Sequence, residues 1–93
     1  MKKIIFNDNE YELLKDERDC FSFDEVKDFF TDYFDDYDYV VGDYSYSKLR
    51  LKGFYDSKNK KVKDLNNYDN LDNYLETQCA YNCKYFVVKR IQK

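Results

Sequence analysis

Hydrophobic and polar residues alternate over several short runs of this chain, and a period of two is typical of a β-strand with one buried face. The strongest run is Lys48–Tyr55, and a second apolar run, Tyr39–Asp43, precedes it across a polar loop at Tyr44–Ser47. The two runs predict a β-hairpin. In its second strand, alternation assigns Leu49, Leu51 and Gly53 to one face and Arg50, Lys52 and Phe54 to the other. An apolar face opposite a basic one predicts a sheet with one packed and one open face.

Three further runs complete the predicted sheet and its connections. Lys2–Phe6 and Tyr11–Leu14 flank a turn rich in Asn and Asp, which tolerate the conformations of a tight hairpin. Lys84–Ile91 is an apolar strand that follows them at the other end of the chain. The charged segment Lys15–Asp19 and the Lys- and Asn-rich segment Ser57–Asn67 lack periodicity, so we expect loops there, the second of them mobile.

A spacing of three and four residues predicts a first helix after Ser22. Ser22 and Glu25 have the spacing of a capping box, and the helix is expected to end near Asp35 and Asp36, because carboxylates are unfavourable at a helix C-terminus. Its apolar stripe consists of Phe23, Val26, Phe30, Tyr33, Phe34 and Tyr37. Such a stripe is typical of a helix face that covers a sheet, so we predict that Tyr33 and Phe34 are structural.

A second helix is predicted to begin at Asp69 or Asn70, and its apolar face holds Leu71, Tyr74, Leu75 and Cys79. The element order is therefore ββαββαβ. It predicts an α+β fold in which about five strands form a small antiparallel sheet and both helices pack on one face. The length of 93 residues fits a single domain, residues 1–93.

Charge is distributed unevenly along the chain. Residues 1–47 carry 5 basic and 14 acidic side chains, whereas residues 48–93 carry 11 basic and 5 acidic ones. This asymmetry predicts either a basic face for an acidic partner or an ordinary solvated surface. The chain has no apolar run long enough for a transmembrane helix and no secretory signal pattern. With three cysteines, an odd number, these features predict a cytoplasmic protein with reduced thiols and no membrane contact.

Two segments resemble one bacterial family. Residues 37–56 read YDYVVGDYSYSKLRLKGFYD, and residues 71–90 read LDNYLETQCAYNCKYFVVKR. The first is similar to the family pattern DYIVGDWGYxQLRLKGF, with Tyr44 and Ser45 in place of Trp-Gly, and the second to its Cys-containing ending. Together they cover somewhat under half of the chain, which resembles the YutD-like proteins. The resemblance implies a small bacterial cytosolic protein and carries over no activity.

The residues needed for common enzyme chemistry are missing from this sequence. With no histidine, a Ser-His-Asp or Cys-His nucleophile cannot be assembled, and neither nucleotide-binding glycine motif is present. Asp36 could pair with Asp38 or Asp43 in an acid–base site, but acidic residues at helix ends and loops are usually solvated. We predict that the protein is not an enzyme and uses no cofactor.

The cysteines are the one candidate metal or redox cluster. Cys79 and Cys83 have a CxxxC spacing, and a structural zinc would need either Cys20 and a carboxylate as well or two subunits that share the metal. The alternative is that Cys79 and Cys83 are small buried hydrophobic residues. We favour the alternative and predict no metal.

A binding function remains, and the hairpin is its candidate site. Cations that neutralise phosphates beside rings that stack on bases are typical of single-stranded RNA recognition. The sequence therefore predicts a small binding or regulatory protein, a monomer or weak dimer, that contacts RNA or a ribonucleoprotein. The alternative is a protein-protein interaction adaptor anchored by the tyrosines. The candidate residues are Asp43, Tyr44, Tyr46, Lys48, Arg50, Lys52, Phe54 and Tyr55, with Lys89 or Arg90 as additional cations.

Overall fold

The computed structural model describes residues 3–6, 8–17, 20–45, 48–78 and 84–91, without the side chains of Ser45 and Gln78. Its strands are β1 (Lys3–Phe6), β2 (Asn9–Asp16), β3 (Tyr39–Ser45), β4 (Lys48–Phe54) and β5 (Lys84–Arg90). Its helices are α1 (Phe23–Val26), α2 (Leu71–Gln78) and the 3₁₀ turns η2 (Asp32–Asp36), η3 (Asp64–Asn66) and η4 (Tyr68–Asn70).

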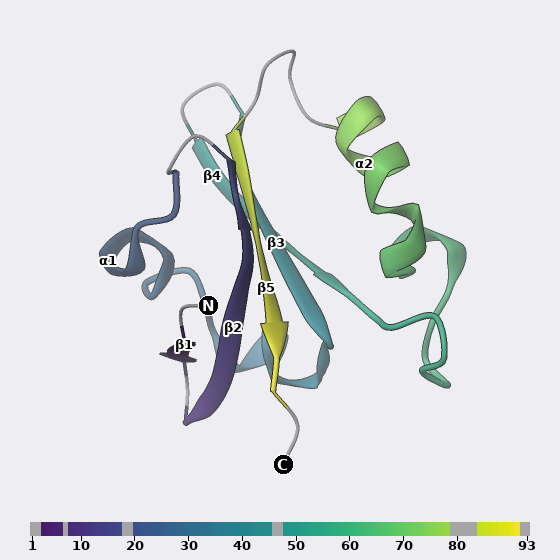
Figure 1. Cartoon of the computed structure of the whole chain (residues 1–93), viewed down its shortest axis with the longest axis horizontal. Helices are drawn as coiled ribbons and strands as arrows, with labels where there is room; N and C mark the ends of the chain where they lie inside the picture. The colour runs from purple at the N-terminus through teal and green to yellow at the C-terminus, as the bar shows by residue number, and fades with distance from the viewer. Residues whose placement is uncertain (1–2, 7, 18–19, 46–47, 79–83, 92–93) are drawn as a thin grey trace.

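The five strands form one sheet in the order β1-β2-β5-β3-β4, and every neighbouring pair is antiparallel. The predicted α+β class, the five strands and the order ββαββαβ are confirmed. β5 lies between β2 and β3 and joins the two hairpins into one sheet (Figure 1). Its apolar run is buried on both faces, because Phe86, Val87 and Val88 have no exposed surface.

The two helices cover opposite faces of the sheet, so the prediction of one helical face was wrong. Figure 1 shows α1 on one side of the strands and α2 on the other. In one core, Val26, Phe30 and Phe34 pack against the strand residues Val40 and Phe86. In a separate core, Leu71 of α2 packs against a different set of strand residues, Tyr39, Val41, Phe54 and Val87. Alternation along β4 is as predicted, with Leu49 and Leu51 in the first core and Phe54 in the second.

The first predicted helix is broken into α1 and η2. Ser22 makes no side-chain capping hydrogen bond, and Thr31 is extended between the two short helices. Asp24, Asp28, Asp32 and Asp36 are spaced four apart, and like charges at that spacing destabilise a helix. The break lets Phe30 stack on Phe6 with ring centroids 4.3 Å apart. These tertiary contacts replace the helical hydrogen bonds that the periodicity predicted.

The predicted aromatic stripe is correspondingly divided. Val26, Phe30 and Phe34 are buried, whereas 42% of Phe23 and 65% of Tyr33 is exposed. The structural role predicted for Phe34 agrees with its burial, and the one predicted for Tyr33 does not.

Both segments predicted as loops contain regular secondary structure within the described residues. β2 continues through Lys15 and Asp16, with a register shift between Leu13 and Lys15. The segment after Tyr55 returns to the sheet, where the Tyr55 amide donates to the Asn66 carbonyl. α2 begins at Leu71, after η4, whose Asn67 side chain accepts from the Asp69 amide, and Cys79 lies outside the described residues.

Two glycines allow aromatic rings to lie directly on the sheet. A Cβ at Gly42 would stand 2.1 Å from Cζ of Phe86, its neighbour across β3 and β5. A Cβ at Gly53 would stand 2.3 Å from Cγ of Tyr37. No real Cβ approaches a ring so closely, so both positions require glycine while the rings stay in place.

We expect Gly42→Ala to destabilise the protein by about 1–3 kcal/mol through overpacking against Phe86. Phe86→Leu should relieve part of this cost, so the double variant should lose less stability than the sum of the single variants. Urea unfolding of the four proteins measures the effect. Lower entropy of the unfolded chain would by itself make Gly42→Ala stabilising. A stabilising effect would therefore contradict the close contact with the Phe86 ring.

Phe34→Ala should lower the free energy of unfolding by about 3–5 kcal/mol, because it removes a buried ring. Tyr33→Ala, one position away, should cost about 1 kcal/mol or less, since the Tyr33 ring is mostly solvated. Equal losses in chemical denaturation would show that both rings lie in the core.

Candidate interaction surfaces

The hairpin face predicted to bind a partner contains an ion pair between a buried carboxylate, Asp43, and an exposed arginine, Arg50. Asp43 on β3 is completely buried, and it lies directly opposite Arg50 on β4. Arg50 Nε donates to Asp43 Oδ1 at 2.9 Å, and the Tyr74 hydroxyl of α2 donates to Oδ2 at 3.3 Å. A buried carboxylate is costly unless it is paired, and here a strand cation and a helix hydroxyl satisfy it. The bond to Asp43 raises the pKa of Arg50 above its usual range.

Lys52 and Phe54 complete this cluster on the α2 side of the sheet. Lys52 Nζ lies 5.4 Å from the centroid of the Phe54 ring and 5.7 Å from that of Tyr74. Phe54 is only 1% exposed and meets the Tyr74 ring edge to face. Its ring is therefore covered by α2 and offers no face for stacking on a base. Lys48, at the start of β4, is exposed.

The predicted tyrosines do not join this cluster. The Tyr44 hydroxyl donates to Glu25 Oε2 at 2.7 Å, on the α1 side of the sheet, and burial and Glu25 together raise the pKa of Tyr44 to about 12. Tyr55 is 8% exposed, stacks on Tyr37 and donates to Asp36. Tyr46 lies outside the described residues. The structure thus brings together Asp43, Arg50, Lys52 and Phe54, and it separates them from Tyr44 and Tyr55.

Sequence reasoning did not identify Tyr74 as a partner of the hairpin. β3 continues through Ser45, so the loop predicted at residues 44–47 was too long: Ser45 pairs with Lys48, and this register sets Asp43 opposite Arg50. A loop over residues 44–47 would instead have set Asp43 opposite Lys48, so the sequence prediction missed the cross-strand ion pair. The contact of the Tyr74 hydroxyl with Asp43 could not be predicted either, because no local sequence pattern specifies which face of the sheet α2 covers.

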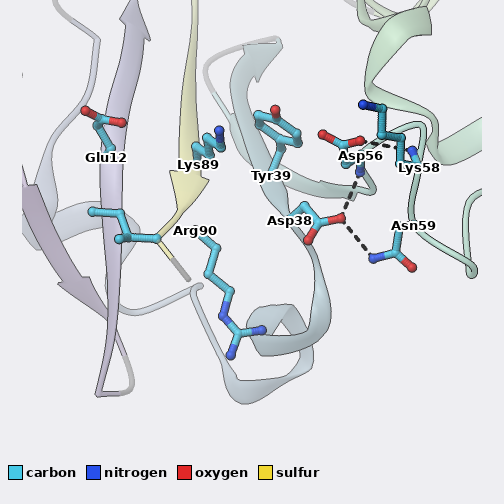
Figure 2. Close-up of a pocket in the computed structure, with 9 residues that line it drawn as sticks. Glu12, Asp38, Tyr39, Asp56, Lys58, Asn59, Lys89 and Arg90 are labelled. Atoms are coloured by element: carbon cyan, nitrogen blue, oxygen red, sulfur yellow. Dashed lines mark hydrogen bonds between the residues drawn. The ribbon is translucent and has the colours of Figure 1, made fainter. Parts of the chain in front are cut away.

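A second candidate surface is an open pocket of about 520 Å³ at one end of the sheet (Figure 2). Asp38 Oδ2 organises one wall by accepting from the Asp56 amide at 2.8 Å and from Asn59 Nδ2 at 2.9 Å. The Arg90 guanidinium donates to the Asp35 carbonyl, and in Figure 2 it extends away from Lys58. The remaining lining residues are Glu12, Tyr39, Asp56, Lys58, Lys89 and Ile91. Three acidic and three basic residues line this pocket, so its net charge favours neither an anion nor a cation.

The third candidate surface is the outer side of α1 and η2. Phe23, Phe29 and Tyr33 expose 42%, 56% and 65% of their surface. Residues 22–37 hold six carboxylates and one lysine. Phe29 was not identified from the sequence because it lies outside the predicted helical stripe.

The cysteines form no metal site within the described part of the chain. No group of three potential metal ligands occurs there, and Cys79 and Cys83 lie outside it. Cys20 is partly buried, and burial, followed by the Asp16 carboxylate, raises the pKa of its thiol to about 11. Cys20 is therefore protonated at neutral pH and is a poor nucleophile. Among the residues described, no helix has the length and apolar character to cross a membrane.

Fold and sequence together define a class of small α+β proteins, a five-stranded antiparallel sheet with a helical layer on each face. The chain belongs to the YutD-like family: the family model described as "Putative antitoxin YutD-like" matches residues 5–89. The resemblance inferred from the two sequence segments is thereby confirmed.

Two known proteins are similar over most of their length. "Putative antitoxin YutD" of Bacillus subtilis (strain 168) is 40% identical over 90 residues, which cover 97% of this chain and 99% of that protein. The solution NMR structure of protein yutD from B. subtilis superposes with a TM-score of 0.83 at 39% identity, covering 100% of this chain and 84% of that chain.

The ion pair on the hairpin face should be structural. Arg50→Ala should lower the free energy of unfolding by about 2 kcal/mol or more, because it removes the cation from a buried carboxylate. Lys52→Ala, on the same strand and face, should cost about 1 kcal/mol or less, since it loses only ring contacts. Thermal or urea unfolding compares the two, and equal losses would show that the Asp43 contact adds nothing.

Proposed function

We propose that this chain is a non-enzymatic binding protein of the antitoxin class, which acts by forming a complex with a protein partner. The similar Bacillus subtilis protein and the family both bear the description of an antitoxin. An antitoxin of this kind neutralises a harmful protein by covering the surface that the harmful protein needs. Such a role requires a docking surface and no catalytic residues.

The observation that carries this proposal is the internal use of the basic hairpin face. RNA recognition there would need available cations and open rings. Arg50 is bound to Asp43, Lys52 lies over two rings of the same chain, and Phe54 is buried. Of the two hypotheses from the sequence, this arrangement favours the protein partner over RNA.

The exposed rings of α1 and η2 support the same conclusion. Aromatic side chains are enriched among residues that dominate protein-protein binding, and exposed apolar patches mark interaction sites. Phe23, Phe29 and Tyr33 lie within eleven consecutive residues on the side of the sheet away from the basic cluster.

The proposal is tested by producing the tagged chain in Bacillus subtilis, the organism of the similar protein, and purifying it after exhaustive nuclease digestion. We expect a protein to remain bound in a fixed ratio. Produced alone, that protein should inhibit growth, and co-production of this chain should relieve the inhibition. Growth curves and the composition of the purified complex are the two measurements.

A variant with Lys48→Gln and Lys52→Gln is the matched control, because it removes two hairpin cations without touching the Asp43–Arg50 pair. Protein binding should survive these changes. If nuclease releases everything bound, or if the double variant loses its partner, the hairpin binds nucleic acid and the proposal is wrong. A stable partner that is harmless when produced alone would instead indicate an adaptor.

A further inference from the structure

The outer side of α1 and η2 combines exposed rings with unneutralised negative charge. We call it the acidic-aromatic surface and define it by Phe23, Phe29, Tyr33, Asp24, Glu25, Asp28 and Asp32, all of which are exposed. It lies on the face of the sheet opposite α2 (Figure 1).

Burial in the core does not account for the exposed ring of Phe29 in this surface. Val26, Phe30 and Phe34 from the same segment fill the core beneath it and are each at most 8% exposed. Phe29 directs more than half of its surface to solvent although its neighbour Phe30 is buried. A polar residue at position 29 would avoid exposing an apolar ring to water. The ring is therefore better explained by a contact outside the chain.

Two of the exposed rings are already held in place. Phe23 stacks on Phe6 with centroids 5.3 Å apart and an interplanar angle of 14°. Tyr33 meets Phe34 edge to face at 5.0 Å, and its hydroxyl lies 3.1 Å from that of Tyr37. Rings that are fixed before binding lose little conformational entropy when a partner covers them, which is the property expected of interface anchors.

The charges of the surface select the partner. Lys27 is its single basic residue, and it is already paired with Asp24 at 3.5 Å. Glu25 accepts a hydrogen bond from the Tyr44 hydroxyl, which brings no positive charge to the surface. Asp28 and Asp32, beside Phe29 and Tyr33, are exposed carboxylates with no ion pair to a described residue. A field of this sign repels nucleic acid and attracts a surface rich in Lys and Arg.

From this combination we propose that the acidic-aromatic surface is the docking site for the protein partner, and that the partner presents a Lys- and Arg-rich face with shallow apolar pockets. The inference rests on the proposed function, because it takes the protein partner from there. It adds the surface, the anchoring rings Phe29 and Tyr33, and the chemistry of the occupant.

The first test uses a phage-displayed library of random peptides, selected against the immobilised full-length protein. We expect the selected peptides to be enriched in Lys and Arg together with apolar residues. Phe29→Ala combined with Tyr33→Ala should weaken binding of a selected peptide by about tenfold or more, as for interface anchors. Leu65→Ala, which truncates an 85% exposed residue outside the surface, is the matched control and should leave affinity unchanged.

The charge requirement has its own pair of variants. Asp28→Asn with Asp32→Asn should weaken peptide binding and reduce its dependence on salt, whereas Asp72→Asn with Glu76→Gln on α2 should change neither. Urea unfolding of each variant confirms that the fold is retained. Selected peptides that lack basic residues, or that bind the ring variant as well as the original protein, would overturn the proposal.

The second test applies the same variants to the protein recovered in the nuclease-resistant complex. If that protein binds the ring variant normally and is still neutralised, the proposed function stands and the surface is wrong. If no growth-inhibiting partner exists but basic peptides bind at Phe29 and Tyr33, the surface stands and the antitoxin role fails. If the ring variant loses both partner binding and neutralisation while the control variants keep both, the surface and the function are supported together.

Discussion

Burial of the two central strands on both faces is the constraint on which the rest of this structure depends. Val40 and Val41 on β3, and Phe86 and Val87 on β5, have no exposed surface, and consecutive residues point to opposite faces. Each face therefore needs its own cover, which α1 and η2 provide on one side and α2 on the other. A layer on one face alone would leave half of these side chains in water.

Much of this arrangement could be predicted from residue patterns. The hairpin around residues 44–47 and the facing of Leu49 and Leu51 follow from a period of two, which is a local property. The broken first helix could not, because its break depends on contacts of Phe30 with rings on β1 and β2 that lie far away in the sequence. The side of the sheet chosen by α2 likewise depends on which core has room for Leu71.

The candidate site was harder to predict than the fold, for a related reason. Alternation correctly grouped Arg50, Lys52 and Phe54 on one face, but it gave no means of knowing that α2 covers that face. With α2 in place, Phe54 is buried and Arg50 and Lys52 contact groups of the same chain instead of forming an open surface. Conversely, Tyr33 was predicted to be structural because it lies on the stripe of the assumed continuous helix, and Phe29 lies outside that stripe, yet both rings are exposed.

The position of β5 has a consequence for how the chain acquires its structure. β2 and β3 never touch as strands, and β5 bridges them although it follows both in sequence. Each hairpin can form early from local contacts, but its inner edge stays unpaired until residues 84–90 arrive. Until then two open strand edges face solvent, which are templates for pairing with other chains. The slow, non-local step that closes the sheet is therefore also the step that protects a newly made molecule from aggregation.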